Sequence, residues 1–167
     1  MADIIECIYA DHDWLRRQFF LLDDARTPEE LGAVWDQLSV RLDTHAEAEE
    51  VVFYPALLKE GDSGDPVDET EDAITDHNEI REAVREAGRH EVGSDKWFEA
   101  VGKARTENGE HLDEEEREAL PDFIKSASLE RRHELGMRWV QFYARHPAGR
   151  GVDTASKDAE DYIEQNS

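Results

Sequence analysis

The sequence is poor in sulfur: Cys7 is the only cysteine among its 167 residues. A single cysteine cannot form an intrachain disulfide, and it leaves too few thiolates for a cysteine-rich zinc site. Long hydrophobic runs are lacking as well, because none approaches the roughly 18 apolar residues of a membrane-spanning helix. The amino-terminal stretch MADIIECIYADHD has no basic segment and carries acids among its apolar residues. We therefore expect no signal peptide, no membrane span and a cytoplasmic protein.

Positive charge is also scarce. The chain has 19 Lys and Arg against 42 Asp and Glu, which gives a formal net charge of −23 at pH 7. So acidic a surface repels phosphate backbones and anionic lipid headgroups, which argues against nucleic-acid and membrane partners. Only five of the basic residues are lysines. An acidic, lysine-poor composition is typical of halophilic organisms, such as haloarchaea, that keep molar salt in the cell, and we interpret it in that way.

Strand patterns are absent, and helical ones run through the whole chain. Hydrophobic residues make up 38% of the sequence and recur three and four positions apart, as in helices that bury one face. This spacing predicts helices at about 3–24, 28 to beyond 52, 68–90, 96–124 and 129–145. We expect an all-α fold, an up-and-down four-helix bundle with an additional C-terminal helix. The bundle would span residues 1–146, and residues 147–167 would form a polar tail with one short helix near Tyr162.

Two halves of the chain repeat one set of polar residues on the apolar helix faces. Each half has an Asp-His pair with Arg four residues after the His, and later His-x-x-x-Glu-Glu with Pro five residues further on. The histidines are His12 and His45 in the first half, 33 residues apart, and His77 and His111 in the second, 34 apart. Helical solenoids also have periods in the thirties. They repeat small and aromatic packing residues, however, so the repeated histidines, acids and prolines disfavour a solenoid.

The spacing of the repeated residues favours a metal site. Residues four apart lie on one helix face, so His45 with Glu49, and His111 with Glu115, each present a nitrogen and a carboxylate side by side. Excursions of 33 and 34 residues return the chain of an antiparallel bundle to the same height, which predicts one inward layer of four histidines. Such a layer is costly to bury without metal and ordinary with it. Nitrogen and oxygen ligands suit Fe, Mn or Zn, and six protein ligands fit two bridged ions better than one.

A less specific interpretation has to be weighed against the metal site. A single buried histidine is more often a hydrogen-bonded core residue than a ligand, and helix faces rich in Glu are usually solvated. One His-x-x-x-Glu sequence would therefore be weak support. Here it occurs twice, in a duplicated frame with His12 and His77 on the apolar stripes, which favours the metal site. The alternative is a regulatory or structural helical bundle that a bound metal ion only staples, without redox chemistry.

Four segments resemble the hallmark segments of the hemerythrin family, in particular its HHE cation-binding branch. They are HAEAEEVVFYPAL from His45, HLDEEEREALPDF from His111, DHDWLR from Asp11 and DHNEIR from Asp76. The resemblance covers about residues 4–145 and implies an oxo- or hydroxo-bridged di-iron centre. It implies terminal ligands and bridging carboxylates at His12, His45, His77, His111, Glu49 and Glu115. Oxygen-carrying members place the last carboxylate five residues after its histidine, which would select Glu116, so that choice stays open.

Arg81 departs from the pattern of the oxygen-carrying members, which have a fifth histidine at this position, one turn after the third. Arginine does not bind metal, and Glu79, Glu82 or water are the candidates for the vacant coordination position. The five-histidine arrangement is what leaves a single open position for reversible O2 binding. The resemblance therefore implies another role here: interaction with O2, peroxide or nitric oxide in sensing or detoxification, or storage of iron.

Several other chemically suggestive residues are expected outside the site. Cys7 lies about 140° around the helix from His12 and is interpreted as a small core residue. Tyr9, one turn before His12, is expected to pack, with the option of a hydrogen bond behind the site. Pro55 and Pro121 are expected to kink or end their helices. Three more histidines are expected at the surface and four tryptophans between helices: His90, His133, His146, Trp14, Trp35, Trp97 and Trp139.

Overall fold

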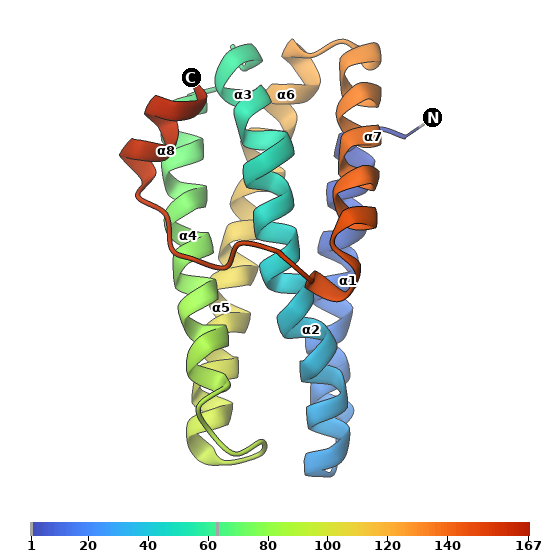
Figure 1. Cartoon of the computed structure of the whole chain (residues 1–167), viewed down its shortest axis with the longest axis vertical. Coiled ribbons are helices and arrows are strands. Elements are labelled where there is room, and N and C mark those ends of the chain that lie inside the picture. Colours follow the sequence, from blue (N-terminus) through green and yellow to red (C-terminus); the bar gives the residue numbers. More distant parts are fainter. Residues whose placement is uncertain (1, 63) are drawn as a thin grey trace.

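The computed structural model describes residues 2–62 and 64–167, and within these ranges the chain is helical with no strand. Four long helical segments run up and down side by side, and a further helix packs along one end of the bundle (Figure 1). The long segments are α1 (Ile4–Asp24), α2 (Pro28–Ala48) with its continuation, α4 (Pro66–Ala87) and α5 (Asp95–Arg117) with its continuation, and the further helix is α7 (Leu129–Arg145). The predicted all-α bundle with an additional C-terminal helix is confirmed.

Capping side chains explain where the first helices begin, because they satisfy backbone N–H groups that have no partner within the helix. The Glu30 N–H donates to the Thr27 hydroxyl at 3.2 Å, and the Thr27 N–H donates to the Glu30 carboxylate at 3.2 Å. This reciprocal capping box stands directly before Pro28, the first residue of α2. Asp3 caps α1 by accepting a hydrogen bond from the Ile5 N–H at 3.0 Å. Local side-chain chemistry therefore sets these helix starts.

Pro55 interrupts the second long segment, as predicted. Here α2 passes through a π-helical segment, η1 (Glu49–Phe53), into α3 (Tyr54–Glu60). The Tyr54 N–H bonds to the Glu49 carbonyl, five residues back, which is the wider spacing of a π-helix. Proline has no N–H to donate, so the carbonyls that would have paired with residue 55 need partners from elsewhere in the fold.

Pro121 has a comparable effect on the fourth long segment. The prediction of one helix over 96–124 is wrong in this detail, because α5 ends at Arg117 and α6 (Ala119–Ser126) follows. Glu118 between them has φ −121° and ψ −76°, which is not helical. In a continuous helix the ring of Pro121 would clash with the carbonyl of Arg117. The break at Glu118 avoids this clash.

The core is divided along the bundle into two apolar clusters with a polar layer between them. In α1, the buried apolar residues between Ile4 and Ile8 belong to one cluster and those between Leu15 and Leu22 to the other. Asp11 and His12 lie between these two groups and are equally buried. Buried polar groups are costly unless they have partners. The fold therefore has to satisfy a polar layer in the middle of its core.

The C-terminal segment crosses the bundle instead of leaving it. After α7 a short turn, η2 (Pro147–Gly149), redirects the chain, with Gly149 at φ +70°, where glycine is favoured. The chain then crosses the face formed by α2 and α4 and ends in α8 (Ala159–Asn166) beside α4 (Figure 1). The short helix predicted near Tyr162 is present, and Tyr162 is buried.

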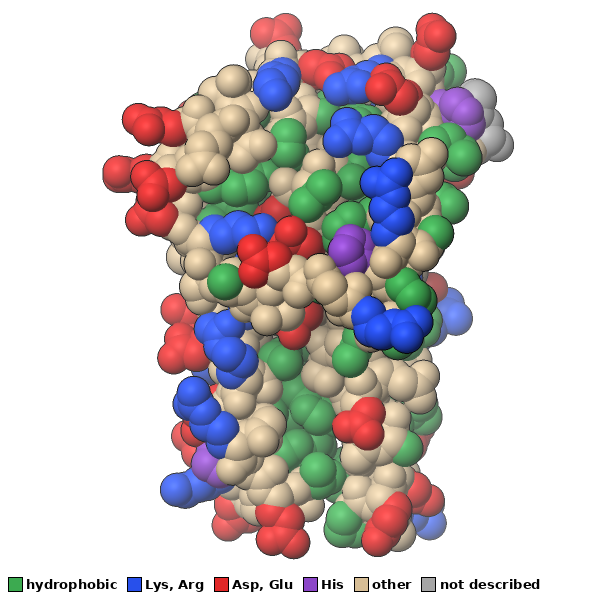
Figure 2. Space-filling view, viewed as in Figure 1, with side chains coloured by type: hydrophobic (Ala, Val, Ile, Leu, Met, Phe, Trp, Pro, Cys, Tyr) green, Lys and Arg blue, Asp and Glu red, His purple; other side chains and the backbone are tan. Residues whose placement is uncertain are grey.

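Charge dominates the surface. Figure 2 shows acidic side chains projecting around the rim of one face, with basic ones among them and hydrophobic ones exposed in a furrow of the lower half. None of the described helices has the length and the apolar character that crossing a membrane requires.

Candidate metal centre

Four histidines from four different helices meet in the polar layer of the core. His12 comes from α1, His45 from α2, His77 from α4 and His111 from α5, and each is at most 2% exposed. The inward layer expected from the 33- and 34-residue spacing is therefore present. Glu49, at the start of the π segment, is fully buried in the same layer. Whether these side chains bind metal stays a prediction.

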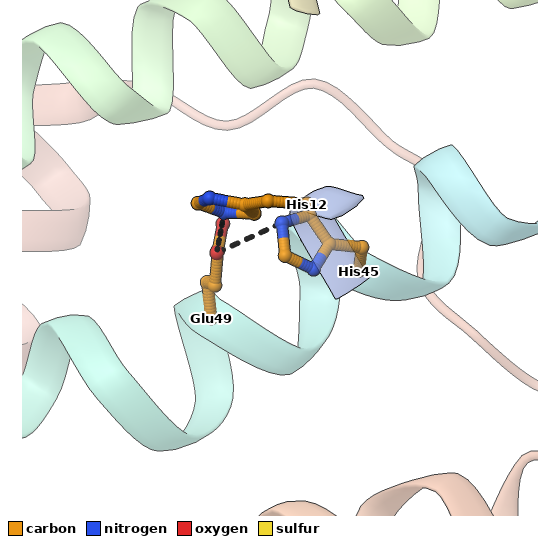
Figure 3. Close-up of side chains that lie close together, drawn as sticks. All are labelled: His12, His45 and Glu49. Atoms are coloured by element: carbon orange, nitrogen blue, oxygen red, sulfur yellow. Dashed lines mark ion pairs between the residues drawn. The ribbon is translucent and has the colours of Figure 1, made fainter. Parts of the chain in front are cut away.

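Glu49 lies in the middle of the four imidazoles and turns one oxygen towards each pair. Its Oε1 is 2.9 Å from Nε2 of His45 and 3.7 Å from Nε2 of His12 (Figure 3). Its Oε2 is 3.1 Å from Nε2 of His77 and 3.6 Å from Nε2 of His111. Each oxygen with its pair of imidazoles forms a group of buried ligand atoms within 4.8 Å of one another. The carboxylate is thus shared by two candidate cation positions.

Glu115 completes the layer, and Glu116 lies outside it. Glu115 is 4% exposed, and its Oε2 is 3.1 Å from Nε2 of His12. Its Oε1 accepts a hydrogen bond from the hydroxyl of the buried Tyr54 at 2.9 Å. The Glu116 carboxylate instead reaches the opposite nitrogen of His12, Nδ1, at 2.8 Å, and accepts from Arg16 at 2.7 Å. Of the two carboxylates left open by the sequence, the structure therefore turns Glu115 towards the centre.

Several buried polar atoms of the layer lack hydrogen-bond partners. They are Nε2 of His12 and His45, Oε1 of Glu49 and Oε2 of Glu115. These atoms approach one another to 2.9–3.7 Å as ion pairs, without the geometry of a hydrogen bond. Leaving a buried polar atom unsatisfied costs about 1–3 kcal/mol. Lone pairs of imidazole nitrogen and carboxylate oxygen that converge in this way are what a bound cation accepts, so the residues present fit the metal ions that the sequence predicts.

A carboxylate lies behind every imidazole of the layer, at the nitrogen that faces away from Glu49. The four pairs are His12 with Glu116 at 2.8 Å, His45 with Asp11 at 3.4 Å, His77 with Glu50 at 2.7 Å, and His111 with Asp76 at 3.5 Å. Histidines that bind metal usually donate their other N–H to such a partner, which fixes the tautomer and the direction of the ring. All four Nε2 atoms are thereby left free to face inward.

These orienting carboxylates were missed from the sequence, although the repeat contains them. Asp11 and Asp76 are the acids of the two Asp-His pairs, and Glu50 and Glu116 are the second acids of the two Glu-Glu pairs. Each Asp serves the second histidine of its own half, and each Glu serves the first histidine of the other half. The repeated Asp-His and Glu-Glu pairs could have revealed them, because each pair places a carboxylate directly beside a residue that faces inward.

Arginines hold three of the four orienting carboxylates. Arg16 binds Glu116, Arg41 contacts Asp11, and Arg81 binds Glu50. Asp11 also accepts a hydrogen bond from Tyr143 of α7 at 2.6 Å. Asp76, the fourth, has no Lys or Arg partner within the described ranges. The carboxylates behind His12, His45 and His77 are therefore each fixed by an arginine, whereas the one behind His111 is not.

Arg81 stands at the position of the fifth histidine of oxygen carriers. Its side chain is fully buried and faces Glu50 rather than the imidazoles. Its two terminal nitrogens donate to the two oxygens of Glu50, each at 3.0 Å. Glu79 and Glu82, two of the candidates for the vacant position beside water, do not turn inward. Glu79 is paired with Lys103 at 2.6 Å with its side chain 43% exposed, and Glu82 is exposed to solvent. Both carboxylates lie on the outward face of α4, where water competes with any inward contact.

Without metal, the layer is an array of ion pairs. Burial opposes ionisation of Glu49, but the charge of His45 and the close contacts with His111 and His12 lower its pKa well below the usual value. Burial also opposes protonation of His111, yet the neighbouring carboxylates of Asp76 and Glu49 raise its pKa to about 10. The pKa of His12 is likewise raised well above normal against the effect of burial, by its close contacts with the carboxylates of Glu115, Glu116 and Glu49. A cation that binds here must displace protons from imidazoles.

A small pocket with acidic walls connects the surface to the centre. Tyr54, His111 and Glu115 line its inner part. The rest of its lining includes five carboxylate residues of α4 and α5 and the residue after α5, namely Glu69, Asp72, Asp76, Glu114 and Glu118. No Lys or Arg is among the described residues that line it. A route of this kind admits water-sized ligands and attracts cations.

The other singled-out residues lie outside the centre. Cys7 packs partly buried against the first apolar cluster, and Tyr9 is 39% exposed with its ring 6.3 Å from that of His12. The three remaining histidines bond elsewhere: His90 to Glu86, His133 to the Ala2 carbonyl and His146 to the Arg150 carbonyl. Trp35, Trp97 and Trp139 are buried and Trp14 is partly buried, which agrees with the predicted packing role.

One family of known proteins matches the chain. The model of the hemerythrin HHE cation binding domain matches residues 3–123. No curated protein and no solved structure shows a significant match. The matched region holds all four histidines and both central glutamates, whereas α7 and the C-terminal segment lie beyond it.

Proposed function

Because the chain belongs to the hemerythrin HHE cation-binding family, we propose that it binds two iron ions in the polar layer of its core. The ligands in this proposal are His12, His45, His77, His111, Glu49 and Glu115. A pair of irons supplies redox capacity and open coordination positions for O2, peroxide or nitric oxide. The protein would use it to sense or detoxify these small molecules, or to store iron.

The observation that carries the proposal is the position of Glu49 between two imidazole pairs. Its two oxygens face opposite pairs at 2.9 and 3.1 Å for the nearer nitrogen of each, the arrangement of a carboxylate that bridges two cations. The unpartnered buried atoms of His12, His45 and Glu115 support the same conclusion. Nitrogen and oxygen donors without thiolate suit Fe, with Mn or Zn as further candidates.

The chain's own residues have three roles in this proposal. The orienting carboxylates hold each imidazole with Nε2 inward, and burial of the layer excludes bulk water. Tyr54 keeps a proton at its hydroxyl oxygen beside Glu115, because burial and the neighbouring carboxylates of Glu115 and Glu49 raise its pKa well above the usual value. Tyr54 also lines the acid-walled pocket. Tyr54 therefore holds Glu115 on the side where a small ligand would enter.

Arg81 favours reaction or iron handling over simple oxygen carriage. The guanidinium is committed to Glu50, so no fifth imidazole supports the His77 side. Coordination there depends on fewer protein ligands than in oxygen carriers, which leaves more positions for exogenous ligands.

Burial favours a second candidate function, a redox-inert ion that staples the bundle. The four histidines, Glu49 and Glu115 are all at most 4% exposed, and a closed structural site has no open position for a ligand. The choice between the two functions depends on the metal and on its access to small molecules.

Metal analysis combined with visible spectroscopy tests the proposal. Protein purified without a metal-affinity tag is expected to hold about two irons per chain. Its near-ultraviolet and visible bands are expected to change between N2 and O2 and after addition of peroxide, nitric oxide or azide. A colourless protein loaded with zinc, with spectra that none of these ligands alters, would support the staple and refute the redox function.

A further inference from the structure

The C-terminal segment, which lies beyond the matched domain, reaches one corner of the candidate metal centre. Lys157 lies between α7 and α8, and its ammonium contacts the carboxylates of Glu47 and Glu50. Glu50 is the residue that orients His77, with its Oε1 2.7 Å from Nδ1. One side chain therefore separates Lys157 from an imidazole of the centre.

Lys157 is held in this position by backbone contacts with α4. The side-chain amide of Asn78 makes two hydrogen bonds with the backbone of Lys157. Its NH2 group donates to the Lys157 carbonyl at 2.7 Å, and its Oδ1 accepts from the Lys157 N–H at 2.9 Å. Arg85, two turns further along α4, donates to the Thr154 carbonyl at 3.0 Å. Asn78 directly follows His77, so the segment is attached to the same turn of helix that carries the imidazole.

Tyr162 of α8 provides a second link, to the backbone that carries Glu49. Its hydroxyl donates to the Glu50 carbonyl at 2.6 Å, and the ring is 8% exposed. In η1 this carbonyl would pair with the N–H of residue 55, five positions on, but that residue is Pro55 and has no N–H. Tyr162 thus satisfies a backbone acceptor that the proline leaves free. Without it, the π segment would hold an unsatisfied carbonyl next to Glu49 and Glu50.

The charge of Lys157 offsets the negative charge of the carboxylates behind His77. Glu50 is buried and Glu47 is 9% exposed, so two neighbouring carboxylates are removed from water. Arg81 pairs with both, at 3.0 and 3.5 Å, and supplies one positive charge. Lys157 supplies the second, which balances the pair. Removing that charge would leave two buried carboxylates with Arg81 as their shared cation, and their repulsion would loosen the contact of Glu50 with His77.

We propose that Lys157 and Tyr162 are positioning residues for the cation held by Glu49, His77 and His111. This inference rests on the proposed two-cation centre. The His12 and His45 side is held by other groups, because Glu116 is bound by Arg16 and Asp11 by Arg41 and Tyr143. The C-terminal segment therefore makes the two cation positions unequal, and losing its contacts weakens one of them selectively.

Stepwise titration of the metal-free full-length protein with Co(II) tests the inference. The wild type is expected to bind two equivalents in two resolvable steps. Lys157→Met is expected to weaken one step by about 10- to 100-fold, the range for loss of a group behind a metal ligand, and to leave the other unchanged. Tyr162→Phe is expected to act on the same step in the same direction. Lys157→Arg is expected to restore most of the affinity, and Lys125→Met, at an exposed lysine of α6, is the matched control.

A spectroscopic readout identifies the affected side. Each imidazole bound to Co(II) through Nε2 gives a shifted proton resonance from its Nδ1–H. In Lys157→Met and Tyr162→Phe, the His77 resonance is expected to broaden through faster solvent exchange, while those of His12 and His45 stay sharp. Equal weakening of both steps, or an unchanged His77 resonance with wild-type affinity, would overturn the inference. A wild type that binds fewer than two equivalents would overturn the two-cation proposal itself.

Discussion

The carboxylate of Glu116 lies 2.8 Å from Nδ1 of His12, on the opposite side of that ring from Glu115. Two consecutive glutamates thus contact the two nitrogens of one imidazole. Glu115 contacts the nitrogen that faces the centre, and Glu116 contacts the nitrogen on the other side of the ring. The same division of labour links Glu49 and Glu50 to His77. Doublets of this kind allow one short sequence to supply both a candidate ligand and the group that orients a ligand.

Three glutamates of α5 provide a matched test of these positions. Glu116→Gln is expected to lower metal affinity by about 10- to 100-fold, because it weakens the orientation of His12. Glu115→Gln is expected to lower it further, because it removes an inward oxygen that has no other partner. Glu110→Gln, at an exposed residue that does not line the pocket to the centre, is the control and should match the wild type. Competition with a chromophoric chelator measures the affinities. A larger loss for Glu116→Gln than for Glu115→Gln would contradict the assignment.

Metal content should follow the histidines of the layer and no others. His45→Ala and His111→Ala are each expected to lose most of the bound metal, since each removes an imidazole nitrogen adjacent to Glu49. His133→Ala should keep it, because His133 bonds to the Ala2 carbonyl away from the centre. Elemental analysis of the three purified variants is the measurement. Equal content in all three would show that the bound metal is not held by this layer.

Arg81 should contribute strongly to stability. Arg81→Met leaves Glu50 and Glu47 buried with one cation fewer, and breaking a buried ion pair in this way costs about 3–5 kcal/mol. Arg81→His, which would supply the fifth imidazole of oxygen carriers, is expected to carry a similar cost. The control is Arg89→Met, whose pair with Glu86 is exposed to solvent, where an ion pair contributes little to stability. Urea unfolding of the variants gives the free energies, and equal losses for Arg81→Met and Arg89→Met would contradict the prediction.

The stability of the metal-free protein should fall as pH rises above neutrality. His111 has a raised pKa, about 10 against a usual 6.5. A raised histidine pKa stabilises the fold fully below the unfolded value, and this contribution is lost as pH rises through the folded value. The loss is therefore expected between about pH 6.5 and 10. Metal affinity should change in the opposite direction, because the bound imidazoles must be deprotonated.

Urea unfolding of metal-free protein at several pH values in this range measures the effect. The same series with metal bound is the control, and it should not show the alkaline decline until the metal itself is lost. Metal-free protein that gained stability from pH 6.5 to pH 10 would contradict the arrangement of ion pairs.

Salt and metal should each stabilise the fold. The net charge of −23 opposes compaction, and salt relieves it by shortening the Debye length from about 10 Å at 0.1 M to about 3 Å at 1 M. Metal offsets carboxylate charge in the core and binds the folded chain, which contributes about 2.7 kcal/mol at a hundredfold excess over the dissociation constant. The metal-free protein should melt well below the metal-bound form at 0.1 M potassium chloride, with the difference narrowing at high salt. Thermal midpoints across a potassium chloride series provide the measurement, and a salt-independent metal-free form would refute the coupling.

Much of the fold was predictable because its determinants are local. The three- and four-residue spacing of apolar side chains defined the helices, and Thr27 with Pro28 marked the start of α2. Pro121 indicated that the fourth helix would be interrupted, but the sequence did not place the break at Glu118. The π segment at Glu49 was missed as well, because it reflects how the chain around Pro55 settles against neighbouring helices.

The sequence by itself determined that four histidines share one inward layer, because helical periodicity fixes the face of each side chain and the duplicated spacing fixes its height. It also showed that Arg81 stands where a fifth histidine would be. Only the tertiary structure decided that Glu115 faces the centre, that Glu50 orients His77 and that Lys157 reaches Glu50. The physical reason is that these contacts join residues up to 107 positions apart. They depend on how each helix is rotated against its neighbours, and the packing of the whole core sets that rotation.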